Sequence, residues 1–233
     1  MQLDVTEPES VGSAVAEVIA ATGRLDVLVN NAGIIHTGFF ETLAPHEFEA
    51  VLRTNFYGAV SVTRAVLPHM RTRRQGVIIN VSSLYGLMGA VVASPYAASK
   101  WALEGFSESL RHEMAPFGVH VAIVQPGFVA TDMTQETDFQ TEWRYGADSP
   151  YRDAAAGVYA LFSKHILPRS GDAVRVGQLI AKVAESGRPR LRYPIGADTS
   201  AVKWLRRLLP SSLVDRALAT VLSTAMGSQR AKL

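Results

Sequence analysis

The alternation of short β-branched runs with longer helical patterns is the feature that most constrains how these 233 residues can fold. Three apolar runs read as buried strands, over Leu25–Val29, Gly76–Ser83 and Val119–Val124. Stretches of helical periodicity separate them. Strand, helix, strand, helix predicts βαβ units, and therefore a parallel sheet with helices packed on its faces.

The helices are predicted from apolar spacing and from residues that favour helix ends. Thr6 is the expected first N-cap, because Glu9 completes a capping box three residues later. Ser94 is the expected cap of the third helix, with Pro95 at its first position. The helices so predicted follow Thr6 up to Gly23, run from Pro45 to about Arg71, and run from Ser94 to about Phe117.

The pattern changes after the third strand, although the chain reads as a single domain over 1–233. Residues 131–170 are rich in aromatic side chains set among polar ones, which indicates a substrate loop or lid. A small helical subdomain with its own core explains the same pattern, and both can hold. A helix over Val174–Ala184, an extended Pro189–Pro194 and two amphipathic helices, one around Trp204–Leu209 and one over Leu213–Met226, complete the prediction.

Composition excludes several classes of protein. Apolar residues make up 48% and charged residues 19%, so the chain is globular rather than disordered. It contains no cysteine, which excludes disulfides, cysteine-ligated zinc and a cysteine nucleophile, and its six histidines show no metal-binding spacing. No apolar run is long enough to span a membrane and no signal peptide is visible. A cytoplasmic location is expected.

Charge is distributed unevenly along the chain. Residues 1–187 hold 14 Lys and Arg against 19 Asp and Glu, whereas residues 188–233 hold 9 against 2. The basic C-terminal helical extension over 188–233 reads mainly as a solvated helix face packed on an acidic body, and contact with an acidic partner or anionic lipid is the alternative. No nucleic-acid-binding module is present, so we expect no nucleic-acid partner.

Tyr96 and Lys100 are the first residues that suggest catalysis. They lie four apart in a predicted helix and therefore share one face, a turn apart. An ammonium close to a phenol stabilises the phenolate and lowers the phenol pKa, which makes a proton-transfer pair at neutral pH. Ser83 ends a buried strand, where its hydroxyl can hydrogen-bond a substrate oxygen facing this helix.

Asn55 stands inside the second predicted helix, where asparagine is a poor helix former. With Gly58 nearby, it marks either a kink or a water site. The alternative is an exposed polar residue without a role.

Together these residues resemble the classical short-chain dehydrogenase/reductase family. Over roughly residues 3–133 the chain carries Asn30-Asn31-Ala32-Gly33, Asn55, Ser83, Tyr96-x-x-x-Lys100 and Pro126-Gly127-Phe128-Val129-x-Thr131 in the order and spacing of that family. The stretch Gly86–Gly89, the aromatic insertion and the basic tail look most like the 17β-hydroxysteroid and retinol dehydrogenase branch. The fold that the resemblance implies is a Rossmann-type, doubly wound α/β fold.

The resemblance also implies a mechanism that uses NAD or NADP. Tyr96 is implied as the general acid in reduction and the general base in oxidation. Lys100 lowers the pKa of Tyr96 and holds the nicotinamide ribose, while Ser83 orients the substrate oxygen. Asn55 is implied to hold a water that links Lys100 to solvent.

The implied cofactor site draws on several strand ends. Asp4 matches the acidic residue that contacts the adenine amino group. Val129 and Thr131 match the residues beside the carboxamide and phosphate. The complete set of implied cofactor residues is Asp4, Asn31, Ala32, Gly33, Tyr96, Lys100, Pro126, Gly127, Val129 and Thr131. No metal is implied.

One departure from the family is plain. No two glycines in this chain are two positions apart, so the Gly-rich phosphate loop is absent, as is the strand-end residue that separates NAD from NADP. The family's first two strands have no counterpart, which predicts an open edge at Leu25–Val29 and weak or no nucleotide binding by the chain as written. Two explanations for the missing strands and loop stay open: a start site placed too far downstream, which is favoured because the remaining motifs are intact, or a truly truncated gene product.

Two functions therefore stand against each other. The first is an NAD(P)-dependent oxidoreductase acting on a small apolar alcohol or carbonyl, such as a sterol-, retinoid- or acyl-like molecule. The second is an inactive fragment or scaffold of the same family. The complete Asn55, Ser83, Tyr96 and Lys100 set argues against long decay. The resemblance leaves a homodimer and a homotetramer open.

Overall fold

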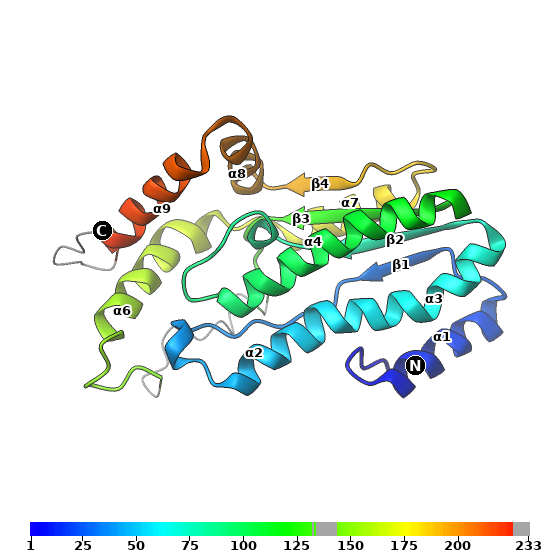
Figure 1. The fold of residues 1–233 in the computed structure, drawn as a ribbon, viewed down its shortest axis with the longest axis horizontal. Helices are drawn as coiled ribbons and strands as arrows, with labels where there is room; N and C mark the ends of the chain where they lie inside the picture. Colours follow the sequence, from blue (N-terminus) through cyan, green and yellow to red (C-terminus); the bar gives the residue numbers. More distant parts are fainter. Residues whose placement is uncertain (132, 134–143, 226–233) are drawn as a thin grey trace.

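Four parallel strands form the sheet in the computed structural model, which describes residues 1–131, 133 and 144–225. The strands follow one another across the sheet in chain order, with their carboxyl ends on the same side (Figure 1). They are β1 (Val27–Asn30), β2 (Gly76–Val81), β3 (Val119–Pro126) and β4 (Arg192–Ile195). The predicted parallel α/β sheet is confirmed.

Helices cover both faces of this sheet. On one face, α1 (Pro8–Thr22), α3 (Ala59–Arg73) and α4 (Ser94–Met114) close over a core that includes Ile78 of β2. On the other face, α7 (Ala173–Ala184) packs on the next strand residue, Ile79. Successive side chains of a strand point to opposite faces of the sheet, and here each face has its own apolar core. This explains why the strands are apolar throughout.

The second predicted helix is interrupted. It consists of α2 (Pro45–Leu52), a π-helical turn η2 (Arg53–Gly58) and α3. A π-helical turn holds one more residue than an α-helical turn and so changes the direction of the side chains within it. Asn55 lies in this turn, so the irregularity signalled by an asparagine in mid-helix is present.

Both predicted side-chain caps are wrong. The cap position of α1 is Glu7, and the Thr6 hydroxyl donates a 2.7 Å hydrogen bond to the Asp4 carboxylate instead of accepting one from the helix. The cap position of α4 is Ala93, without a side-chain cap, and the Ser94 hydroxyl is buried with no partner among the described residues. Gly23 does end α1, in the left-handed conformation with φ of 72°.

The C-terminal third is helical except for β4. Pro189–Pro194, predicted as extended, contributes β4 by pairing with the end of β3. The predicted Val174–Ala184 helix is α7, and no described helix is long and apolar enough to cross a membrane. The further helices are α6 (Arg152–Leu161), α8 (Ala197–Leu208) and α9 (Ser211–Ala225), with the short turns η1 (Phe40–Thr42), η3 (Leu84–Gly86), η4 (Ala115–Phe117), η5 (Phe162–Ile166) and η6 (Leu167–Arg169). Met226, the expected end of the last helix, lies outside the described residues.

β1 is an edge strand of the described sheet. Val27 and Val29 are 37% and 38% exposed, which agrees with the open apolar edge expected there. Leu3 and Asp4 form no strand and are exposed.

Candidate active site

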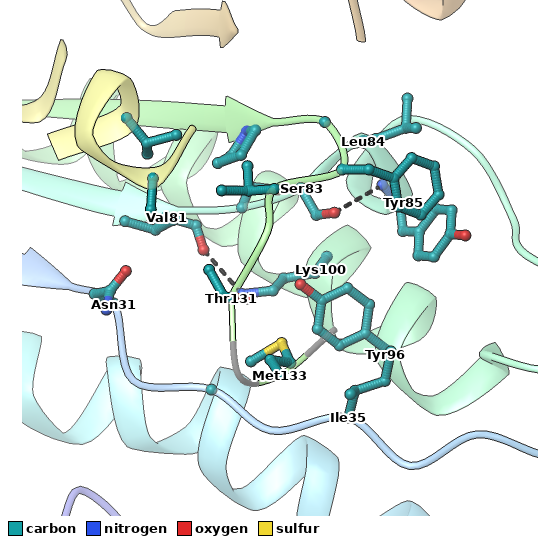
Figure 2. A pocket seen from close by; sticks show the side chains of 18 of the residues that line it. Asn31, Ile35, Val81, Ser83, Leu84, Tyr85, Tyr96, Lys100, Thr131 and Met133 are labelled. Carbon is teal, nitrogen blue, oxygen red and sulfur yellow. Dashed lines mark hydrogen bonds between the residues drawn. The ribbon is translucent and has the colours of Figure 1, made fainter. Parts of the chain in front are cut away.

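A cavity of about 810 Å³ opens at the carboxyl ends of β1, β2 and β3. Figure 2 shows Ser83, Tyr96 and Lys100 converging on it from two different elements. Most of the residues predicted for the site line this one cavity, whereas Asp4 and Asn55 do not. Those that line it are Asn31, Ala32, Gly33, Ser83, Tyr96, Lys100, Pro126, Gly127, Val129 and Thr131.

Tyr96 and Lys100 both belong to α4, which starts at Ser94 and therefore places them in its first two turns. Lys100 is only 4% exposed, and its Nζ donates a 2.9 Å hydrogen bond to the carbonyl oxygen of Val81 at the end of β2. The same Nζ lies 5.4 Å from the centroid of the Tyr96 ring. The helix thus holds an ammonium against a phenol, as the spacing predicted.

Burial sets the protonation of this pair. Burial lowers the pKa of Lys100 to about 8, and the negative charge of Glu104 partly opposes that fall. Burial also raises the pKa of Tyr96, while its hydrogen bond with Ser83 lowers it in part. The two causes that act on the pKa of Tyr96 in the structure are thus burial and the Ser83 hydrogen bond, with burial the larger. The lowering of this pKa by Lys100 stays a prediction.

Ser83 links the end of β2 to the turn η3. Its Oγ accepts a 3.1 Å hydrogen bond from the backbone N–H of Tyr85, so the serine caps that turn (Figure 2). This bond uses a lone pair of the oxygen and not its hydrogen, so the hydroxyl can still donate toward Tyr96 or a ligand.

Asn55 ties two parts of the site together from behind. Its Oδ1 accepts a 2.8 Å bond from the N–H of Ile34, and its Nδ2 donates to the Ile34 carbonyl at 3.0 Å and to Ser99 Oγ at 3.1 Å. Asn55 is 1% exposed, so it is not the exposed polar residue that the sequence left open. It fixes the loop that follows Gly33 against α4.

Asp4 lies apart from the cavity. Its Oδ1 accepts hydrogen bonds from the backbone N–H and the hydroxyl of Thr6, at 2.8 and 2.7 Å. These hydrogen bonds lower the pKa of the exposed Asp4 carboxyl. The structure brings Asp4 to the turn before α1 and not to the residues that line the cavity.

A row of aromatic rings lies along one wall of the cavity, and sequence reasoning missed Tyr85, which stands within that row. The Tyr85 ring meets Tyr96 edge to face at 6.1 Å and Phe128 at 5.7 Å, and Phe128 meets Phe162 at 5.4 Å. Burial raises the pKa of Tyr85, and the nearby Tyr96 and Asp198 act in the same direction. The signal available was position: Tyr85 lies two residues after Ser83, and Phe128 follows Pro126-Gly127 at the end of β3.

Asp198 of α8 was also missed, and it shapes the loop after β3. Its two oxygens accept 2.8 Å bonds from the N–H groups of Phe128 and Thr199. A Cβ at Gly127 would lie 2.0 Å from Asp198 Oδ1, so only glycine fits there without a rearrangement. The Pro126-Gly127 signal in the sequence thus has a packing explanation beside any role toward a cofactor.

The residues present suit the nicotinamide end of a dinucleotide. A buried ammonium, a phenol and a hydroxyl lie beside apolar walls in one cavity at the strand ends, where parallel sheets bind such ligands. The sequence holds no Gly-rich phosphate loop, so none of its residues is assigned to the pyrophosphate. No group of three or more potential metal ligands occurs among the described residues.

Parallel sheets with helices on both faces bind dinucleotides at the carboxyl ends of their strands, and Ser83, Tyr96 and Lys100 gather at those ends here. The family model described as short chain dehydrogenase matches residues 1–142. The chain belongs to the short-chain dehydrogenase family, which confirms the predicted class of enzyme and its use of NAD or NADP.

Three relatives illustrate the match. The chain is 38% identical over 195 residues to 3-ketodihydrosphingosine reductase of Bacteroides thetaiotaomicron, covering 83% of this chain and 71% of that protein. It is 39% identical over 213 residues to retinol dehydrogenase 8 of Bos taurus, covering 90% and 68%. Among solved structures it resembles ElxO with NADP bound, with a TM-score of 0.66 and 28% identity over 83% of this chain and 75% of the other.

Proposed function

We propose that this protein interconverts an alcohol and a carbonyl on an apolar substrate by hydride transfer, with Tyr96 as the proton donor and acceptor. The observation that carries the proposal is the convergence of Ser83, Tyr96 and Lys100 in one cavity. Ser83 approaches from the end of β2, and the other two from α4, so a substrate oxygen between them meets both hydroxyl groups.

The protonation states favour Tyr96 as an acid in the reduction of a carbonyl. Burial raises the pKa of Tyr96, so the phenol holds its proton at neutral pH. Ser83 donates a hydrogen bond to the carbonyl oxygen and Tyr96 transfers a proton to it as negative charge develops there. The ammonium of Lys100, 5.4 Å from the ring centroid, stabilises the phenolate left behind. Bound reduced nicotinamide dinucleotide would supply the hydride.

Asn55 has a supporting role in this proposal. Both hydrogens of its Nδ2 are engaged, with Ile34 and with Ser99. Asn55 Oδ1 accepts one hydrogen bond from the protein, so its second lone pair can bind the water that, as the family resemblance implies, links Lys100 to solvent. In the same proposal Asn31, Ala32, Gly33 and the loop from Pro126 to Thr131 hold the cofactor.

The walls of the cavity support an apolar substrate. Tyr85, Phe128 and Phe162 form the aromatic wall, and Val176 and Ile180 of α7 add aliphatic surface. We assign the described residues of the predicted loop 131–170 to a substrate loop because Thr131, Met133 and Phe162 contribute to the lining. Residues 132 and 134–143 of that stretch lie outside the described residues. The two relatives named for 3-ketodihydrosphingosine and retinol have substrates with long hydrocarbon portions, which agrees with this assignment.

A turnover assay tests the proposal directly. The chain is incubated with NADH or NADPH and a panel of aliphatic, steroid and retinoid carbonyls, and nicotinamide absorbance is followed. We expect oxidation of the nucleotide with at least one apolar carbonyl, and a loss of about 10²–10⁴-fold in kcat for Tyr96→Phe. Turnover that is undiminished in that variant removes Tyr96 from its role.

The absent phosphate loop favours a second candidate, an inactive fragment or scaffold of the family. A fluorescence titration with NADH and NADPH separates the two. Saturable binding supports the oxidoreductase, whereas no binding by a correctly folded chain supports the scaffold.

A further inference from the structure

Lys100 needs a counter-charge, because an ammonium that is 4% exposed is costly to keep protonated. Its hydrogen-bond acceptor, the Val81 carbonyl, carries no net charge. Glu104 lies four residues further along α4, on the same face, and is itself 5% exposed. The two buried ionisable groups therefore occupy neighbouring turns of one helix beneath the cavity.

Glu104 is held in place from two strands. Its Oε1 accepts a 2.9 Å hydrogen bond from Gln125 Nε2 of β3, and its Oε2 accepts a 2.9 Å bond from Arg192 Nε of β4. The Arg192 guanidinium also donates a 2.8 Å bond to the exposed Glu108, one turn beyond Glu104. Gln125 and Arg192 thus hold the Glu104 carboxylate in place one turn from Lys100, and the contact with Arg192 is a charge-assisted hydrogen bond.

We propose that Glu104 is a positioning residue for the reaction: anchored by Gln125 and Arg192, its carboxylate keeps the buried Lys100 protonated beside Tyr96. The inference rests on the proposed function for its consequence in catalysis, but the charge coupling between the two side chains is a property of the protein alone. It also gives β4 a role in the site, since Arg192 reaches α4 from that strand.

The other groups around the pair do not replace Glu104. Tyr96 on α4 and Tyr85 on η3 both have raised pKa values and are neutral near pH 8. Arg192 is a cation and cannot supply the counter-charge, and Glu108, which pairs with it, is more exposed and a turn further away. Among the residues that the structure describes, Glu104 is the carboxylate whose charge raises the pKa of Lys100.

The test measures the pKa of Lys100 in the intact chain. The sequence contains only five lysines, so protein labelled with ¹³Cε and ¹⁵Nζ lysine gives few signals, and Lys100→Arg assigns the one of interest. We expect a pKa of about 8 in the wild type. In Glu104→Gln we expect it to fall by about 1 unit or more, because the opposite charge that favours the protonated amine is removed.

Glu108→Gln is the matched control, because it removes one carboxylate from the same helix and one partner from the same arginine. We expect this variant to change the pKa of Lys100 by less than about 0.3 units, since the exposed charge is screened by solvent. Glu104→Asp keeps the charge and should restore most of the wild-type value. An unchanged pKa in Glu104→Gln, or an equal fall in Glu108→Gln, overturns the inference.

Gln125→Met covers the case in which Glu104→Gln does not fold. It removes a neutral anchor of the Glu104 carboxylate and no charge, so the pKa of Lys100 should fall, but by less than in Glu104→Gln. An unchanged or raised value contradicts the anchoring. The readout requires neither nucleotide nor substrate. A chain that shows the expected shifts but binds no nucleotide thus refutes the proposed function and leaves the charge coupling standing.

Discussion

Glu47 on α2 should carry much of the acid sensitivity of this protein. A bidentate hydrogen bond from Arg144 is the main reason that the pKa of Glu47 falls from 4.5 to about 2, although burial of the carboxylate acts the other way. The N–H of Ala44 donates a 2.8 Å bond to the same carboxylate, and His36 Nδ1 lies 3.7 Å from it. The pair joins Arg144 to α2, and Arg144 also donates a 2.8 Å hydrogen bond to the carbonyl of Thr42, just before that helix.

The magnitude follows from the two pKa values. At 1.36 kcal/mol for each pKa unit, the lowered pKa of Glu47 contributes about 3 kcal/mol to the free energy of unfolding at neutral pH. Because the folded-state pKa is below the unfolded one, this stability is complete above pH 4.5 and is lost as the pH falls toward 2. About 2 kcal/mol should be gone by pH 3.

Urea unfolding of the wild type and Glu47→Gln at pH 7, 4 and 3 measures this contribution. We expect Glu47→Gln to be less stable at pH 7 by up to about 3 kcal/mol, and the difference to shrink by about 2 kcal/mol at pH 3. Glu49→Gln, which removes an exposed carboxylate from the same helix, should follow the wild type at every pH. Equal pH dependence in the wild type and Glu47→Gln would refute the reasoning.

Three further variants test other parts of the site. Gly127→Ala should lower the free energy of unfolding by about 1–3 kcal/mol, because its Cβ overlaps Asp198, whereas Gly89→Ala enters open space and should be neutral by the same urea titration. Asn55→Ala should cost about 1–3 kcal/mol in that assay, because it leaves the part-buried N–H and carbonyl of Ile34 unpaired. A cost below about 0.5 kcal/mol contradicts the tether. Phe162→Ala should raise the KM of a long apolar substrate about tenfold or more but leave that of a short one nearly unchanged, and equal effects on both argue against a wall that binds substrate.

The fold was predictable where local sequence decides it. β1 and β2 consist mainly of valine, isoleucine and leucine, and this composition is sufficient to identify them as buried strands. β4 was not identified as a strand, because Arg192, Tyr193 and Pro194 carry no such signal. That strand forms by pairing with residues about 70 positions earlier, and Pro194 is tolerated because β4 lies at the edge of the described sheet.

The site was predictable where one helix or one strand end supplies the side chains. Tyr96 and Lys100 meet because four residues make about one turn, and Ser83 follows from the end of its strand. Asp198 and Arg192 could not be predicted, because they meet the site from segments far away in sequence. The caps at Thr6 and Ser94 failed for a different reason: a competing local acceptor engages the first, and the second lies one residue inside its helix.

The π-helical turn at Arg53–Gly58 sets the direction in which the side chains of α2 and of the turn itself point, relative to those of α3. Removing one residue from this turn would restore regular i to i−4 bonding but rotate Asn55 by about 100° relative to α3. Its amide would then point away from Ile34 and Ser99. A shorter, regular α-helix would therefore leave the loop after Gly33 without its anchor. The π-helical turn is the less favourable backbone conformation, and it persists here because it points the Asn55 amide at Ile34 and Ser99.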